Sequence, residues 1–221
     1  MNKIIKCFLL ELDGTIINSG PDLLLALNHV LQKNINKTID KNVIGSLVGG
    51  GAEAMIKRAY NFLDEKVPSN NIDLLINCFL DFYIKNCSNN SYLYPNVDDT
   101  IKSLKSKFKI AICTNKKQDI TEKILQEFNI QNYFDFVLGS SIKLKLKPDT
   151  EMLEHCLEIL QVKPEQAIMV GDSMNDIIPA QKIGIKTIFV DYGYGKLDKL
   201  AKPNYIFSSF EKILSIPEIR F

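Results

Sequence analysis

The chain has 221 residues, of which 46% are hydrophobic and 24% charged, and its formal net charge is +1. This length suits one domain, or one core with an inserted subdomain. The near-neutral charge gives no reason to expect nucleic acid as a partner. The sequence also lacks the run of about 18 apolar residues that reads as a membrane span. The apolar stretch near the start is interrupted by Glu11 and has no small-residue cleavage site, so we expect a cytoplasmic protein.

The first predicted element is a buried strand of a parallel sheet. Residues 4–10 are mostly apolar, and a turn at Gly14 follows them. Apolar residues at helical spacing then predict helices over 21–34, 51–64 and 70–87. Because no strand pattern occurs between about 18 and 90, we expect this stretch to be a helical insertion.

From Pro95 onward, helix and strand patterns alternate. Helices are expected over 97–107, 118–128, 149–160 and about 174–183. Strands are expected over 108–113, 135–138, 167–171 and 186–190, with a last strand and helix within 204–215. This alternation predicts an α/β fold, a mostly parallel sheet with helices on both faces. The predicted core comprises residues 1–17 and 91–221, with a small helical domain, residues 18–90, inserted into it.

The five cysteines show no C-x-x-C spacing. Two of them lie inside predicted strands, which favours buried free thiols in a reducing compartment.

Two acids, Glu11 and Asp13, follow the first strand. Ligands of open α/β sheets bind at the carboxyl ends of the strands, where both acids are expected. Two carboxylates aimed at one point repel each other unless a cation or a shared proton compensates. The pair therefore predicts a metal site or a shared proton, and a strand that simply ends in a polar turn is the alternative.

Two further polar loops belong to the second half of the chain. Thr114 and Asn115 follow a predicted strand, where a hydroxyl and a helix N-terminus can bind an oxyanion. A routine helix N-cap is the alternative there. Lys147 stands before Pro148, which restricts the lysine backbone to an extended conformation. A solvated basic loop is the alternative for this lysine and its neighbours Lys143 and Lys145.

Asp172 and Asp176 flank the junction between the strand predicted over 167–171 and the helix predicted over about 174–183, and Asp172 directly follows Gly171. Two acids at this spacing suit Mg²⁺, which prefers oxygen ligands and binds through one or two carboxylates. A helix cap explains either acid alone more readily than both together.

These loops resemble the four motifs of the haloacid dehalogenase-like superfamily, in order and over nearly the whole chain. The D-x-D-G-T motif matches residues 11–15 except at its first position. The second motif falls on Thr114, the third on Lys147 with Pro148, and the G-D-S-x-x-D motif on residues 171–176. The segment 47–52 is similar to a cap segment of phosphoglycolate phosphatases. The resemblance implies a Rossmann-like core with a helical cap, and an Mg²⁺-dependent phosphatase acting on a small phosphorylated metabolite.

The resemblance also implies residue roles. Carboxylate 11 is the nucleophile that forms an acyl-phosphate, and Asp13 is the general acid and base. Thr114 and Lys147 bind the phosphoryl oxygens. The implied metal ligands are Glu11, Asp13, Asp172 and Asp176, and the implied substrate contacts are Gly14, Thr15 and Asn115 in the core with Gly50 and Arg58 in the cap. A solvated cap face is the alternative for Arg58.

Position 11 departs from the motif, because the family's nucleophile is normally aspartate. Glutamate is one methylene longer, and a misplacement of about 1 Å can cost on the order of 10²-fold in rate. The sequence therefore leaves three readings open: a working phosphatase, a relative that binds Mg²⁺ and a phosphorylated ligand without turnover, and a sugar-phosphate mutase. In each case the expected partner is a small molecule, and the protein is a monomer or homodimer.

Overall fold

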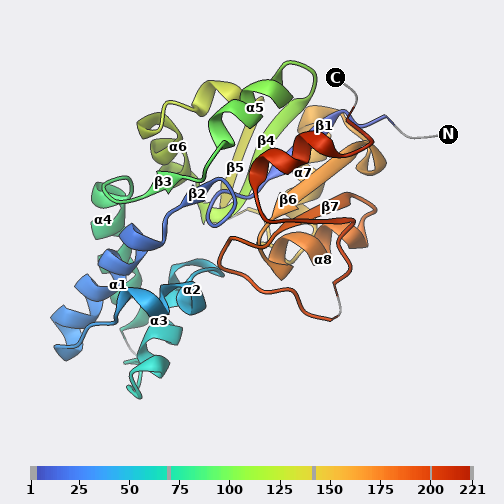
Figure 1. Ribbon diagram of the computed structural model, residues 1–221. Helices are drawn as coiled ribbons and strands as arrows, with labels where there is room; N and C mark the ends of the chain where they lie inside the picture. Colours follow the sequence, from blue (N-terminus) through green and yellow to red (C-terminus); the bar gives the residue numbers. More distant parts are fainter. Residues whose placement is uncertain (1–3, 69–70, 141–142, 200, 220–221) are drawn as a thin grey trace. The chain divides into compact units, whose positions relative to one another are not determined.

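The computed structural model describes residues 4–68, 71–140, 143–199 and 201–219, so residue 70, where one helix was predicted to begin, lies outside the described residues. The chain divides into two compact units (Figure 1). One comprises Met1–Asn18 with Leu93–Phe221, and the other comprises Ser19–Tyr92. The first unit contains the sheet and is called the core unit below, and the second is called the helical unit.

The core unit is built on a six-stranded sheet in the order β5-β4-β1-β6-β7-β8, and every pairing between neighbours is parallel. The strands are β1 (Cys7–Leu10), β4 (Lys109–Lys117), β5 (Phe136–Ser140), β6 (Ala167–Gly171), β7 (Lys186–Val190) and β8 (Tyr205–Phe207). All four residues of β1 are buried, as expected of a central strand that is covered on both faces. The predicted α/β fold with a parallel sheet is confirmed.

Helices cover both faces of this sheet (Figure 1). The core-unit helices are α5 (Val97–Lys105), α6 (Gln118–Glu127), α7 (Glu151–Leu160) and α8 (Met174–Lys182). One apolar cluster joins Cys7 and Leu9 of β1 to Leu153 and Cys156 of α7 and to Ala180 of α8. Because crossovers between parallel strands are right-handed as a rule, the strand order assigns α5 and α6 to the opposite face of the sheet.

The helical unit contains α1 (Gly20–Ile35), α2 (Ile44–Leu47), α3 (Gly51–Phe62) and α4 (Ile72–Asn86). Pro21 occupies the first turn of α1, where its missing N–H is not needed. Asp22 in the same turn is completely buried, and its carboxylate accepts hydrogen bonds from the backbone and side chains of Asn90 and Ser91 at 2.6–3.0 Å. These hydrogen bonds connect the first turn of α1, near the start of the unit, to residues 90 and 91 near its end.

The structure differs from the sequence-based prediction in its details. Strand β4 continues to Lys117 instead of ending at residue 113, with a register shift between Cys113 and Lys117. The last predicted helix is the 3₁₀ helix η4 (Phe210–Ser215). Short elements also went unpredicted, namely β2 (Ile17–Asn18), β3 (Tyr92–Leu93), α2, and the 3₁₀ helices η1 (Lys41–Val43), η2 (Gln131–Tyr133) and η3 (Pro164–Gln166). Elements this short have too few residues to show a hydrophobic period.

Two bulk expectations can be compared with the structure. Its five cysteines are free thiols, as predicted, and four of them are buried. Among the described residues, no helix combines the length and apolar character that a bilayer crossing requires.

Candidate active site

The polar loops predicted from the sequence meet at the carboxyl edge of the core sheet. Glu11 follows β1 directly, and Asp172 follows β6. Thr114 lies within the extended end of β4, and Lys147 lies in the loop between β5 and α7. β4 and β6 both pair with β1, so the ends of three adjacent strands bring these side chains together.

Four hydrogen-bond donors surround the Glu11 carboxylate. Its Oε1 accepts from the backbone N–H of Leu12 at 2.7 Å and of Asp13 at 3.3 Å, and from Thr114 Oγ1 at 2.5 Å. Its Oε2 lies 2.6 Å from Lys147 Nζ. The longer glutamate side chain has folded back onto the backbone of its own loop. Two amides, a hydroxyl and an ammonium thus form a cradle for one anion, and Glu11 supplies that anion.

Lys147 is the charged centre of the site, and its side chain is completely buried. Its Nζ contacts Glu11 at 2.6 Å, Asp176 at 2.5 Å and the backbone oxygen of Cys113 at 2.6 Å. Burial disfavours the ammonium, but the charges of Asp176 and Glu11 outweigh it and raise the pKa of Lys147. Lys147 is therefore a fixed cation and not a solvated loop lysine.

Asn115 holds Lys147 in place. The side-chain amide donates to the Lys147 backbone oxygen at 2.7 Å, and the amide oxygen accepts from the Lys147 backbone N–H at 2.9 Å. In the structure the Asn115 amide binds the loop that carries Lys147, and the substrate contact expected of Asn115 stays a prediction. The proposed N-cap is also not formed at Thr114 or Asn115, because the N-cap of α6 is Lys117.

Asp172 is 4% exposed and lies against the turn at Gly14. Its Oδ2 accepts from the backbone N–H of Tyr194 at 2.8 Å and of Gly195 at 3.2 Å, and Thr15 Oγ1 lies 3.3 Å from its Oδ1. Gly14 has a φ of +80°, and a Cβ there would collide with the Asp172 carboxylate. The Gly14 N–H donates to the Ile17 backbone oxygen, so Gly14 shapes the turn beside Asp172. The substrate contacts expected of Gly14 and Thr15 stay predictions.

Both carboxylate oxygens of Asp176 are engaged by protein groups. Oδ1 pairs with Lys147, and Oδ2 accepts from the backbone N–H of Ser173 at 3.1 Å and from its hydroxyl at 2.7 Å. With Ser173, Asp176 forms a capping box at the start of α8. It therefore positions Lys147 and caps the helix at the same time.

Asp13 is paired with a lysine that sequence reasoning missed. Lys116 Nζ lies 2.9 Å from Asp13 Oδ2, and the two side chains are 5% and 20% exposed. Asp13 is thus the most open carboxylate of the site, since Glu11, Asp172 and Asp176 are buried.

Comparison with known proteins identifies the family. The chain matches the haloacid dehalogenase-like hydrolase family over residues 8–190. This chain belongs to that family. It is 34% identical over 216 residues to a phosphoglycolate phosphatase of Colwellia psychrerythraea, with 95% of each chain covered. It is also 34% identical to a phosphoglycolate phosphatase of Psychrobacter arcticus, with 97% of this chain and 95% of the relative covered.

Solved structures agree with this assignment. The crystal structure of a predicted phosphoglycolate phosphatase from Haemophilus somnus superposes with a TM-score of 0.86 at 30% identity, covering 96% of this chain and 97% of the other. The chain is therefore a phosphatase of the haloacid dehalogenase-like family, similar over nearly its full length to phosphoglycolate phosphatases.

Members of this family typically use Mg²⁺, and the charges of the site fit a divalent cation. Among the described residues, four carboxylates (Glu11, Asp13, Asp172 and Asp176) and two ammonium groups (Lys116 and Lys147) meet at the site, which gives a formal charge of −2. Burial raises the pKa of Glu11 to about 7, and Asp176 and Asp13 add to this rise against the charge of Lys147. Burial, with the charges of Asp176 and Glu11, likewise raises the pKa of Asp172 to about 7. A bound cation would offset the repulsion between these buried carboxylates.

The sequence suggested that all four acids are ligands of one metal ion. The structure does not bring the four carboxylates together round one point. In the part of the chain that the structure describes, no group of three acidic, cysteine or histidine side chains is arranged as a ligand set. Asp176 in particular is engaged by Lys147 and Ser173. This arrangement still suits Mg²⁺, because that ion often binds through one or two carboxylates and keeps several waters.

Gly50 and Arg58 belong to the helical unit. The Arg58 guanidinium donates from Nε and Nη2 to the Leu47 backbone oxygen at 3.0 and 2.6 Å, and from Nη2 to that of Gly49. Gly50 has a φ of +74° and is the N-cap of α3. Arg58 therefore fixes the glycine loop before α3 and is half-buried instead of fully solvated, and its contact with a substrate stays a prediction.

Sequence reasoning also missed the segment 191–195 after β7. Tyr192 donates its hydroxyl to the Thr15 backbone oxygen at 2.8 Å, and Tyr194 donates its hydroxyl to Asn18 Oδ1 at 2.8 Å. A Cβ on Gly193 would collide with the Asp172 side chain. The Tyr-Gly-Tyr-Gly sequence after an apolar strand was the available signal, since it marks a loop that approaches another backbone closely.

Proposed function

We propose that this chain hydrolyses a small phosphorylated metabolite similar to 2-phosphoglycolate, through an acyl-phosphate on Glu11. The observation that carries this proposal is the cradle formed by the Leu12 and Asp13 amides, Thr114 Oγ1 and Lys147 Nζ. These donors hold a carboxylate in the structure, and a phosphoryl group offers oxygens with the same demand for hydrogen bonds and positive charge.

The proposed reaction has two steps. In the first, a Glu11 oxygen attacks phosphorus while the bond to the leaving oxygen breaks, and Asp13 transfers its proton to the departing alcohol. In the second, Asp13 takes a proton from a water whose oxygen attacks the phosphorus, which releases inorganic phosphate and restores the Glu11 carboxylate. Thr114 and Lys147 hold the phosphoryl oxygens throughout.

Glu11, Asp172 and the backbone oxygen of Asp13 are the groups that would hold Mg²⁺. When bound, the ion neutralises charge on the phosphoryl oxygens and lowers the repulsion between those oxygens and the attacking carboxylate. Lys116 holds the Asp13 carboxylate at the mouth of the site, and Asn115 with Asp176 holds Lys147 in the cradle.

One observation favours a second candidate, a protein that binds a phosphorylated ligand without turnover. The folded-back Glu11 carboxylate occupies the donors that a phosphoryl group needs, so the attacking group and the substrate compete for one cradle. Catalysis requires Glu11 to leave these donors when the substrate enters. A ligand that only displaces Glu11 would bind without reacting.

A phosphate-release assay over a panel of small phosphomonoesters, including 2-phosphoglycolate, tests the proposal. We expect turnover that depends on Mg²⁺ and is abolished by EDTA. Asp13→Asn should lower kcat by about 10²–10⁴-fold, the usual contribution of a general acid and base. If no panel member is hydrolysed while inorganic phosphate still binds, the second candidate replaces the first.

A further inference from the structure

The segment 191–195, which follows β7, encloses the side chain of Asp172. Its backbone N–H groups at Tyr194 and Gly195 both donate to Asp172 Oδ2, at 2.8 and 3.2 Å. A Cβ on Gly193 would collide with the Cβ and Oδ2 of Asp172, so a glycine is needed for the backbone to approach this closely. The segment thus fixes one carboxylate oxygen of Asp172 with two backbone N–H groups.

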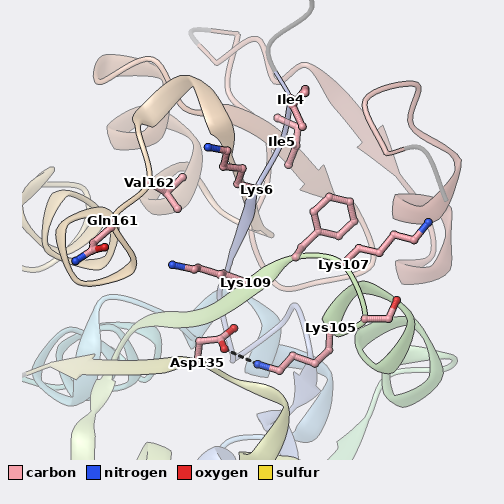
Figure 2. Close-up of a pocket in the computed structure, with 11 residues that line it drawn as sticks. Ile4, Ile5, Lys6, Lys105, Lys107, Lys109, Asp135, Gln161 and Val162 are labelled. Carbon is pink, nitrogen blue, oxygen red and sulfur yellow. Dashed lines mark hydrogen bonds and ion pairs between the residues drawn. The ribbon is translucent and has the colours of Figure 1, made fainter.

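The other oxygen of Asp172 is less engaged. In the described part of the chain its contact is with Thr15 Oγ1 at 3.3 Å, longer than the roughly 2.5–3.0 Å of an ordinary hydroxyl hydrogen bond to oxygen. Asp135, in a pocket at the edge where β1 and β4 begin, is bound differently (Figure 2). Its Oδ1 lies 2.5 Å from Lys105 Nζ, and its Oδ2 accepts from the backbone N–H of Ile110 at 2.8 Å. Both oxygens of Asp135 therefore have close partners, whereas Oδ1 of Asp172 is left for a further ligand.

Two tyrosine hydroxyls hold the segment in this position. The segment contains no helix or strand, so its side-chain contacts contribute to its placement. Tyr194 donates its hydroxyl to Asn18 Oδ1 at 2.8 Å, and Tyr192 donates its hydroxyl to the Thr15 backbone oxygen at 2.8 Å. The Tyr192 ring also packs on the Tyr94 ring, with 4.6 Å between the ring centroids. The two hydroxyl bonds therefore attach the segment to the stretch of chain that leads from β1 to α1.

The number of oxygens that a carboxylate offers affects which ion it binds. Mg²⁺ demands a nearly octahedral shell, and it binds through one or two carboxylates while keeping several waters. Ca²⁺ takes about six to eight oxygens in a flexible shell and often binds both oxygens of one carboxylate. Because two N–H groups hold Oδ2 of Asp172, an ion at this residue meets Oδ1 alone. A fixed ligand that offers one oxygen suits Mg²⁺ better than Ca²⁺.

We propose that Tyr192 and Tyr194 are positioning residues that keep Asp172 a ligand with one available oxygen, and that they thereby make the site prefer Mg²⁺ to Ca²⁺. The tyrosines act through the backbone of their own segment. When a hydroxyl bond is lost, the segment shifts and its two N–H groups hold Oδ2 less firmly. Groups that orient a metal ligand typically contribute about 10–100-fold to metal affinity. This inference rests on the proposed function, because it concerns the ion of that phosphatase.

Calorimetric titrations of Mg²⁺ and of Ca²⁺ into the protein test the proposal, and the measured quantity is the ratio of the Mg²⁺ affinity to the Ca²⁺ affinity. Tyr194→Phe removes the hydroxyl that binds Asn18 and keeps the ring. Tyr205→Phe is the matched control, because it removes a β8 hydroxyl that donates to Glu218, also at 2.8 Å. We expect the ratio to fall at least threefold in Tyr194→Phe and to stay within about 1.5-fold of the unaltered chain in Tyr205→Phe. Tyr192→Phe is a second variant and should lower the ratio in the same direction.

The proposal is overturned if the unaltered chain does not prefer Mg²⁺, if Tyr194→Phe leaves the ratio unchanged, or if Tyr194→Phe and Tyr205→Phe lower it equally. Circular dichroism shows whether each variant is folded, and the ratio in Tyr192→Phe decides if Tyr194→Phe does not fold. Phosphomonoester turnover by the unaltered chain is measured separately. A lowered ratio without any turnover supports the positioning role and rejects the phosphatase, whereas turnover with an unchanged ratio does the reverse.

Discussion

The side-chain amide of Asn115 and the backbone of Lys147 bind each other through two hydrogen bonds, of 2.7 and 2.9 Å. Asn115 belongs to β4, whereas Lys147 belongs to the loop before α7. The pair therefore fixes the loop that carries the buried cation to the strand that carries Thr114. The position of the ammonium depends on a residue that does not itself contact Glu11.

We predict that Asn115→Ala lowers kcat/KM for a phosphomonoester by at least tenfold. The change leaves the Lys147 loop without its anchor, and a displacement of about 1 Å can cost on the order of 10²-fold. Steady-state kinetics and inhibition by inorganic phosphate would measure the effect. Gln126→Ala, which removes an exposed amide from α6, is the matched control. A folded Asn115→Ala variant with unchanged kinetics would show that the two hydrogen bonds between Asn115 and the Lys147 backbone are not needed for catalysis.

Lys147 should also matter for stability, because it lies between two buried carboxylates. Lys147→Met leaves Glu11 and Asp176 without their common cation, and breaking a buried pair typically costs about 3–5 kcal/mol. Urea unfolding at neutral pH would measure this loss. The double change Lys147→Met with Asp176→Asn removes one of the two buried carboxylates that have lost their cation. It should therefore recover part of the lost free energy of unfolding. Lys143→Ala and Lys145→Ala change exposed side chains and should shift the unfolding free energy little.

Much of this site was predictable from local sequence. Each motif follows an apolar strand, and the carboxyl ends of parallel strands meet at one edge, so the sequence alone predicts that Glu11, Asp172 and Lys147 lie close together. The Gly14 turn was equally visible, because it stands between a buried strand and a helix. These inferences needed only the order of strands and loops.

The individual contacts were not predictable in this way. The extra methylene of Glu11 lets it fold back onto the Leu12 amide, which depends on side-chain rotamers and not on spacing. Asn115 and Tyr194 bind groups that are distant in sequence, and a single sequence does not show which distant residues contact each other. The extension of β4 past Cys113 was missed because polar residues interrupt its apolar pattern, while pairing with β5 continues after the register shift.

We predict a Mg²⁺ site that depends on Asp172. Calorimetric titration of Mg²⁺ should show one site in the unaltered chain and at least tenfold weaker binding in Asp172→Asn. The reason is that the buried Asp172 carboxylate provides one of the two acidic ligands of the proposed site. Asp149→Asn, in the loop before α7, is a control for loss of one charge. Equal binding by Asp172→Asn and the unaltered chain would exclude the proposed ligands.

The helical unit offers a separate stability test at Asp22. Its buried carboxylate accepts hydrogen bonds from Asn90 and Ser91, so Asp22→Ala leaves several buried donors without an acceptor. The change should destabilise the protein by at least about 2 kcal/mol. Asp81→Ala, on an exposed position of α4, should change stability by no more than about 0.5 kcal/mol. Thermal unfolding of both variants, followed by circular dichroism, gives the comparison. Similar melting temperatures for the two would contradict the structural role of Asp22.

The measurement that tests the account most directly is the rate of phosphomonoester hydrolysis with Mg²⁺ by the unaltered chain, Glu11→Asp and Glu11→Gln. Aspartate is too short to fold back in the same way, so it frees the cradle and restores the usual attack geometry. We predict that Glu11→Asp raises kcat at least tenfold, about 1.4 kcal/mol of barrier, and that Glu11→Gln abolishes turnover. Equal rates for the unaltered chain and Glu11→Gln, or no hydrolysis by the unaltered chain and Glu11→Asp, would contradict carboxylate 11 as the nucleophile.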